Sequence, residues 1–165
     1  MKYSGDQMDS DLTSDILIYD ILRNSDNEII SKCNVKFIDK SVPAEEDNTI
    51  YIGNVNLDPK TELYDGIIYN TLVNIYVKTK ATDYLQSSRI LRTIIKQVKK
   101  ELKKNEELQT RNIRFGRQTF DYGSVYSLKG INLLVYLDEE EYDEDDLEEI
   151  ENFCGIYYNN NGKID

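Results

Sequence analysis

The clearest pattern of apolar and polar positions lies between residues 67 and 78. Every second position there is apolar or threonine, which is the period of a β-strand with one buried face. This face is expected to consist of Ile67, Tyr69, Thr71, Val73, Ile75 and Val77. The second face mixes amides with large hydrophobic residues, among them Asn70, Leu72, Asn74 and Tyr76. A strand predicted over residues 129–139 repeats the mixture with Asn132, Leu134 and Tyr136, and such half-apolar surfaces usually mark contacts.

Residues 83–104 form the strongest predicted helix. Thr82 and Asp83 can cap its N-terminus. At about 100° per residue, one arc holds the apolar residues expected to lie on the sheet. These are Tyr84, Leu91, Ile94, Ile95, Val98 and Leu102. A narrower arc beside it is basic and consists of Arg89, Arg92, Lys96, Lys99 and Lys103.

The remaining pattern completes an α+β order of elements. It predicts a helix over 9–23, a short helical piece within 24–33, and extended segments or strands over 35–40, 49–55 and 110–125, the last with a possible break at Gly116. Residues 41–48, 56–66 and 104–109 are polar and read as connections. The order predicts an α+β fold with an antiparallel or mixed sheet of about four strands and helices packed on one face.

Negative charge is concentrated in one segment. Eleven of the fourteen residues from Asp138 to Glu151 are acidic, whereas the whole chain has 31 acidic and 20 basic residues and a net charge of -11. Without this segment the two signs balance, so the surplus is local. A solvated tail and an electrostatic contact with a partner both remain open interpretations.

These patterns divide the chain into a single α+β domain over 1–138 and an acidic C-terminal extension, partly helical, over 139–165. Within the extension Leu147, Ile150 and Phe153 recur at three-residue spacing. A short terminal helix could therefore cover the second sheet face within the same chain.

The composition argues against common catalytic chemistry. The chain has no histidine, which excludes Ser-His and Cys-His nucleophile systems, and Cys33 and Cys154 cannot supply the four ligands of an ordinary zinc site. No closely spaced glycines form a phosphate loop, and the acidic segment lacks the glycine and ligand spacing of an EF-hand. We expect no enzyme activity, no cofactor and no metal site.

The same composition bears on location. No run of apolar residues is long enough to span a bilayer, and the first fifteen residues lack the apolar centre of a signal peptide. Two cysteines far apart in the sequence fit a reducing compartment. We expect a soluble protein that stays inside the cell that makes it and has no membrane partner.

Nucleic acid is the natural ligand to consider for the basic arc. Arg111, Arg114 and Arg117 follow it in sequence and could add phosphate contacts. The acidic segment would repel a polyanion, so nucleic acid is the less favoured partner. A nucleic-acid-binding module using 83–104, or a polyanion mimic using 138–151, is the alternative function.

Four stretches carry a resemblance to a known family. They are LRNSDNEIISKC, VKFIDKSVPAEEDNTIYIGNV, TLVNIYVKTKATDYLQSSRILRTIIKQVKKEL and SLKGINLLVYLDEE. In this order, over roughly residues 10–138, the chain resembles the tail terminator or tail completion proteins of tailed bacteriophages. These are small α+β subunits that form a ring, close the tail tube and join it to the head. Typical members end shortly after the last strand, so the acidic extension departs from the pattern.

The resemblance implies a structural virion protein at the head–tail junction. It implies a homo-oligomeric ring, by resemblance a hexamer, with a tail tube protein and a head completion or connector protein as partners. The predicted inter-subunit interface is Asn70, Leu72, Asn74, Tyr76, Leu134 and Tyr136. The predicted charge-complementary contact joins Arg89, Arg92, Lys96, Lys99 and Lys103 to Glu139, Glu140, Asp143, Asp145 and Asp146, within one chain or between neighbours.

Overall fold

The computed structural model describes residues 12–38, 48–63, 66–81, 83–123 and 127–142, and these form one sheet with a layer of helices. The elements are α2 (Ser14–Arg23), the 3-10 helix η1 (Ile30–Lys32), β1 (Asn34–Phe37), β2 (Thr49–Leu63), β3 (Gly66–Lys78), α3 (Tyr84–Lys103), α4 (Glu106–Thr110), β4 (Arg114–Tyr122) and β5 (Leu128–Tyr142).

The sheet has five strands in the order β1-β2-β3-β5-β4. β1 pairs with β2 in parallel, and the other neighbours pair antiparallel. The predicted α+β fold with a mixed sheet is confirmed. The expected number of about four strands was slightly low, because β1 is a four-residue strand that pairs with only the first residues of β2.

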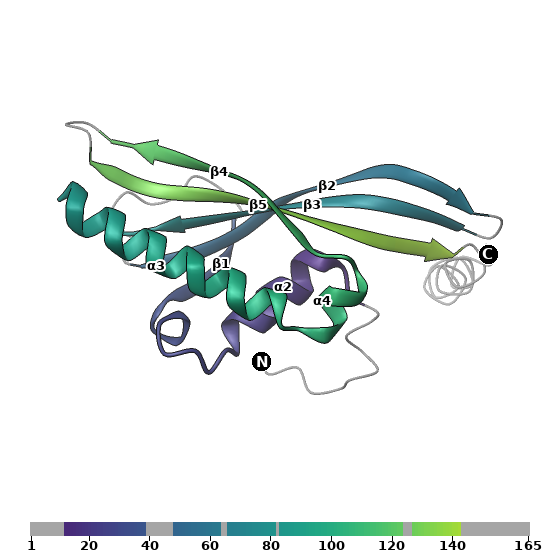
Figure 1. The fold of residues 1–165 in the computed structure, drawn as a ribbon, viewed down its shortest axis with the longest axis horizontal. Coiled ribbons are helices and arrows are strands. Elements are labelled where there is room, and N and C mark those ends of the chain that lie inside the picture. The colour runs from purple at the N-terminus through teal and green to yellow at the C-terminus, as the bar shows by residue number, and fades with distance from the viewer. Residues whose placement is uncertain (1–11, 39–47, 64–65, 82, 124–126, 143–165) are drawn as a thin grey trace, which may run out of the picture.

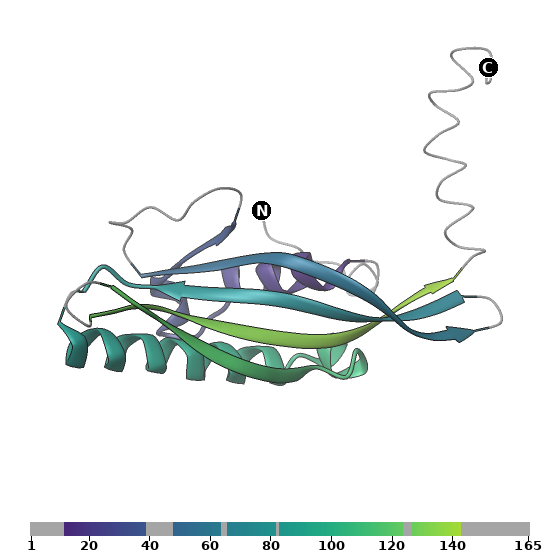
Figure 2. The same ribbon diagram turned by 90° about the horizontal axis from the view of Figure 1, so that it is seen from above.

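All described helices lie against one face of the sheet (Figures 1 and 2). α2 covers the β1, β2 and β3 side, whereas α3 lies along β5 and β3 and also touches α2. The two helices and the sheet enclose one apolar core. Its fully buried members include Leu17, Ile18, Ile52, Ile75, Leu91, Val98, Leu133 and Val135.

The core side of β5, and that of β3 from Thr71 to Val77, follows the predicted alternation, whereas Ile67 and Tyr69, predicted on the same face of β3, are only partly buried. Thr71, Val73, Ile75 and Val77 are buried, and the residues between them are only partly buried. α3 begins where the sequence predicts, because the Asp83 carboxylate accepts a hydrogen bond from the Gln86 backbone N–H at 3.0 Å. Burial of its apolar arc then holds it on the sheet.

β2 departs from the prediction that its second half is a turn. It continues to Leu63 and pairs with β3 as far as the Leu63–Gly66 pair, with register shifts after Gly53 and after Pro59. Only Thr49–Ile52 pair with β1, so within the described chain the rest of β2 forms an edge. A proline and polar residues are tolerated there because an edge strand needs only one row of backbone hydrogen bonds.

A second connection also contains regular structure. Residues 104–109 were predicted as a polar turn, yet Glu106–Thr110 form α4. The Asn105 side chain caps this helix by accepting a hydrogen bond from the Leu108 N–H at 3.0 Å, and Leu108 is fully buried. One buried leucine and one cap therefore make a helix from a segment of polar composition.

β5 runs past the predicted domain boundary at residue 138. It reaches Tyr142, which pairs with Gly66, so Glu139 and the three residues after it belong to a strand rather than to the acidic extension. The rest of the extension, with the helix considered there, lies outside the described residues. β2, β3 and β5 together extend beyond the helix layer as a three-stranded arm (Figure 1).

The packing of α2 gives a matched test of the core. Leu17 is 1% exposed and its neighbour Ile16 is 43% exposed. We expect Leu17→Ala to lower the free energy of unfolding by about 2–5 kcal/mol, because it removes buried methyl groups and leaves a cavity. Ile16→Ala should change it by less than about 1 kcal/mol. Urea unfolding with an unchanged m-value measures both, and equal losses would contradict this description of the core.

Candidate functional site

The sheet face opposite the helices brings together the six residues predicted as an interface. Leu72 lies opposite Tyr136 across the β3–β5 pair, and Asn74 lies opposite Leu134. All six are partly buried, and no described helix covers them. We call this surface the open face; it consists of Asn70, Leu72, Asn74, Tyr76, Leu134 and Tyr136. Its role as an interface stays a prediction.

Two tyrosines of the open face lie over glycines of the neighbouring strand. A Cβ atom added to Gly130 would overlap the Tyr76 ring, and one added to Gly116 would overlap the Tyr136 ring. An aromatic ring that covers a glycine compensates for its missing side chain and pins the strand register. Gly116, predicted as a break, is thus a site of close approach beside the register shift between Phe115 and Gln118.

Tyr76 has two partners within the chain, one at its hydroxyl group and one beside its ring. Its hydroxyl donates a hydrogen bond to Asp121 Oδ2 at 2.8 Å, and its ring lies 6.4 Å from that of Tyr51. Burial and the bond to the Asp121 carboxylate raise the pKa of Tyr76 well above its usual value of about 10. The open face is therefore ordered before any partner binds.

Asn74 is the least satisfied polar residue of the open face. Its Oδ1 atom is buried and has no hydrogen-bond partner within the described chain. An unsatisfied buried acceptor costs about 1–3 kcal/mol, so native structures rarely keep one without a reason.

One end of the open face is closed by polar contacts within the chain. Arg114 Nη2 donates to Asn70 Oδ1 at 3.0 Å and lies 3.5 Å from Asp138 Oδ1. Asn112 Nδ2 donates to Asp138 Oδ2 at 3.3 Å. Asp138, the first residue of the acidic segment, is therefore a structural residue of the sheet.

Glu139 is also engaged within the chain. Its Oε2 accepts a hydrogen bond from the Ser14 N–H at 2.7 Å, at the N-terminus of α2, and lies 3.9 Å from Arg111 Nη1. Arg111 is buried and also contacts Glu107 Oε2 at 3.1 Å and Ser14 Oγ at 3.1 Å. Glu139 was predicted to contact the basic arc, but its position ties β5 to α2 and α4. This pairing was not predicted, because 125 residues separate Ser14 from Glu139 along the chain.

The other predicted acidic contacts remain open. Glu140 lies on β5 and is exposed. Asp143, Asp145 and Asp146 lie outside the described residues.

The basic arc of α3 forms one continuous exposed surface, which we call the basic flank: Arg89, Arg92, Lys96, Lys99 and Lys103. Lys99 is partly buried and the others are exposed. The Arg92 guanidinium stacks 4.7 Å above the Phe120 ring of β4, which places this flank on the β4 side of α3. The opposite side of α3 faces the segment after α2, through Gln97 to Asn27 and Glu101 to Ser25.

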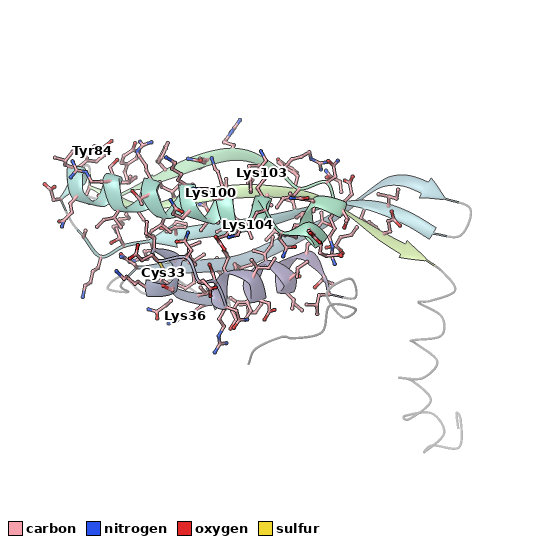
Figure 3. All side chains as sticks on the ribbon, turned by 60° about the horizontal axis from the view of Figure 1, so that its bottom comes forward. Cys33, Lys36, Tyr84, Lys100, Lys103 and Lys104 are labelled. Atoms are coloured by element: carbon pink, nitrogen blue, oxygen red, sulfur yellow. The ribbon has the colours of Figure 1, made fainter. Side chains whose placement is uncertain are left out.

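The basic flank has no internal counter-charge in the described part of the chain. Ion pairs in that part of the chain, such as Lys104 with Glu101, Arg111 with Glu107 and Glu139, and Arg114 with Asp138, do not involve the flank. In Figure 3, Lys100, Lys103 and Lys104 lie toward one end of α3 and Tyr84 lies at the other. The flank is therefore a row of cations along a rigid helix, free to meet an anionic partner.

Two apolar residues at the start of α3 are exposed, which the sequence analysis did not predict. Tyr84 was predicted to lie in the core but is 46% exposed, and Leu85 is 65% exposed. Tyr84 is the first residue of the helix, at the end of α3 far from α4 (Figure 3), where the sheet gives less cover. Tyr122, at the end of β4, is 52% exposed. Helical periodicity does not reveal such end effects.

The described residues contain neither a candidate metal site nor a candidate membrane-spanning helix. No group of three or more Cys, Asp or Glu side chains there is arranged to hold a metal ion. None of the helices in that part of the chain is long and apolar enough to span a membrane.

The Tyr76–Asp121 bond predicts a specific dependence on pH. Because the folded state raises the pKa of Tyr76, this contribution to stability is complete below about pH 10 and is lost as the pH rises further. Tyr76→Phe should lower the free energy of unfolding by about 0.5–1.5 kcal/mol at pH 8. At pH 11 that deficit should shrink or reverse. Urea midpoints at the two pH values measure it, and a deficit of constant size would contradict it.

Because of the contacts of Glu139 within the chain, its substitution should lower the stability of the fold rather than the affinity for a partner. Glu139→Ala leaves buried Arg111 without one of its carboxylates and the Ser14 N–H without its acceptor, so we expect a loss of about 2–3 kcal/mol. Glu28→Ala removes the same charge from an exposed position and should cost less than about 0.5 kcal/mol. Chemical unfolding compares the two, and similar small losses would show that Glu139 is not part of a structural network.

Comparison with known proteins supports the fold. No family model matches the chain, and no curated protein matches its sequence. A solved structure described as the virion of a native gene transfer agent particle contains a chain of similar fold, with a TM-score of 0.53 and 11% sequence identity. The match covers 78% of this chain and 95% of that chain. At this identity the likeness concerns the fold, which the two chains share over almost the whole length of the virion chain.

Proposed function

We propose that this protein is a structural virion protein without enzymatic activity. In the specific form of the proposal it is a tail terminator: copies assemble into a ring that caps the tail tube and joins it to the head-proximal connector. Its partners would be other copies of itself, the tail tube protein and a head completion protein.

The open face is the observation that carries this proposal. The described helices cover one side of the sheet and leave Leu72, Tyr76, Leu134 and Tyr136 on the other. An ordered surface that combines aromatic rings, leucines and amides is typical of protein interfaces.

The fold comparison supports the same class of function. The similar chain comes from a virion of a gene transfer agent particle, and the match spans 95% of that chain. A small subunit that works only in an assembly needs an unfinished surface, and this chain has one. The resemblance of its segment order to tail terminators gives the more specific role.

Assembly on the open face can be tested with one pair of variants. We expect the purified protein to form annuli by electron microscopy, alone or with tail tube protein. Leu134→Asp should abolish them, because it places a charge at the centre of the apolar patch. Ile16→Asp introduces the same charge at an exposed apolar residue of the helix layer and should leave the annuli intact.

Circular dichroism and unfolding midpoints confirm that both variants are folded. Annuli that survive Leu134→Asp would show that the open face is not the interface. A wild-type chain that stays monomeric at all concentrations and with tail tube protein would contradict the ring itself.

A further inference from the structure

We propose that the acidic residues 143–151 of one copy bind the basic flank of a neighbouring copy. This inference rests on the proposed assembly into rings and names the partner of the basic flank: a second copy of this chain, through its C-terminal segment. The contact pairs two different surfaces of the same protein, and a head-to-tail contact of this kind generates a closed ring when its rotation closes.

The distribution of charge along the chain points to residues 143–151 as the ligand of the basic flank. The body of the chain is neutral, and its surplus of acid lies entirely in 138–151. Asp138 and Glu139 are used within the fold by Arg114, Asn112, Ser14 and Arg111. The seven acids of 143–151 follow directly, with no excess of cations elsewhere in the sequence to match them. The five cations of the basic flank have the complementary sign and no acid partner in the described chain.

The flank is built to hold an extended or helical acidic segment. Its five cations follow one line along α3 from Arg89 to Lys103, a rise of about 21 Å. Arg92 is oriented by the Phe120 ring and by its Nε donating to Ser88 Oγ at 2.9 Å. A cation on a packed helix loses less side-chain freedom on binding than one on a loop.

The path of β5 favours a neighbouring copy over the same chain. Tyr142 pairs with Gly66 at one end of β3, whereas α3 starts beyond Lys78 at the other. The two ends of β3 are roughly 40 Å apart. The last described residues of β5 run away from the start of the flank (Figure 1). α3 runs back from its start toward α4, so the Lys103 end of the flank is the end nearer to the arm. To cover the whole flank as far as Arg89 in the same chain, residues 143–151 would have to reverse direction and span its rise of about 21 Å in addition to the distance from the arm.

Charge swapping between copies tests this proposal. A flank-reversed variant carries Arg89→Glu, Lys96→Glu and Lys103→Glu, with Arg92 kept for its contact with Phe120. A tail-reversed variant carries Asp143→Lys, Glu144→Lys, Asp145→Lys, Asp146→Lys and Glu148→Lys. Each should associate with itself at least about tenfold more weakly than the wild type, because like charges face each other.

Mixing the two full-length variants gives the decisive result. In an equimolar mixture each tail meets a flank of opposite sign on the other variant, so association should recover to within about threefold of the wild type. Mass photometry or sedimentation measures it. Recovery should be lost between about 0.1 M and 1 M salt, as the Debye length falls from about 10 Å to about 3 Å. A control with Lys32→Glu, Lys80→Glu and Lys129→Glu, all exposed and outside the flank, should associate like the wild type.

The other outcomes overturn the proposal. If the mixture associates no better than either variant while wild-type annuli persist, the contact is internal or absent, and the ring function stands without it. If flank reversal abolishes binding to duplex DNA and leaves self-association unchanged, the flank is a nucleic-acid surface. If the wild type never self-associates, both this contact and the ring are wrong.

Discussion

A sheet has two faces, and the described residues of this chain supply helices for one of them. That constraint decides most of the structure. Where β3 and β5 pack on α2 and α3, their inward side is almost wholly apolar and fully buried, from Val73 to Val77 and from Ile131 to Leu137. The other side cannot be so apolar if the isolated chain is to stay in solution, nor wholly polar if a partner is to bind it. The mixture of amides, leucines and tyrosines satisfies both demands.

The same constraint explains why the open face is ordered without a partner. The side chains of Tyr76 and Tyr136 approach Gly130 and Gly116 closely, so each buries part of its area against the neighbouring strand. Tyr76 is fixed further by Asp121. Side chains that are already immobile lose little conformational entropy when a second molecule covers them. Because the open face is already ordered, a partner that binds it loses less free energy to side-chain ordering.

Alternation and amphipathicity allowed the fold class, β3 and α3 to be predicted, because their pattern reflects burial. The polar second half of β2 is a strand because it pairs with β3. This pairing could not be predicted from the composition of the segment. Tyr84 follows the helical period but lies at a helix end. The six open-face residues share one side because strand geometry has a period of two, whereas the Glu139–Ser14–Arg111 contacts depend on tertiary structure.

The acidic segment is best understood as two parts with different tasks. Its first residues extend β5 and neutralise Arg111 and Arg114, so they belong to the folding energy of the subunit. The remaining acids lie beyond the last described residue, and the basic flank on α3 is a row of cations that forms no ion pair with the described residues. Exposed pairs contribute only about 0.2–1 kcal/mol each, so such a contact would select partner and orientation more than it would add affinity. The apolar open face would then supply the strength of assembly, and the charges its register.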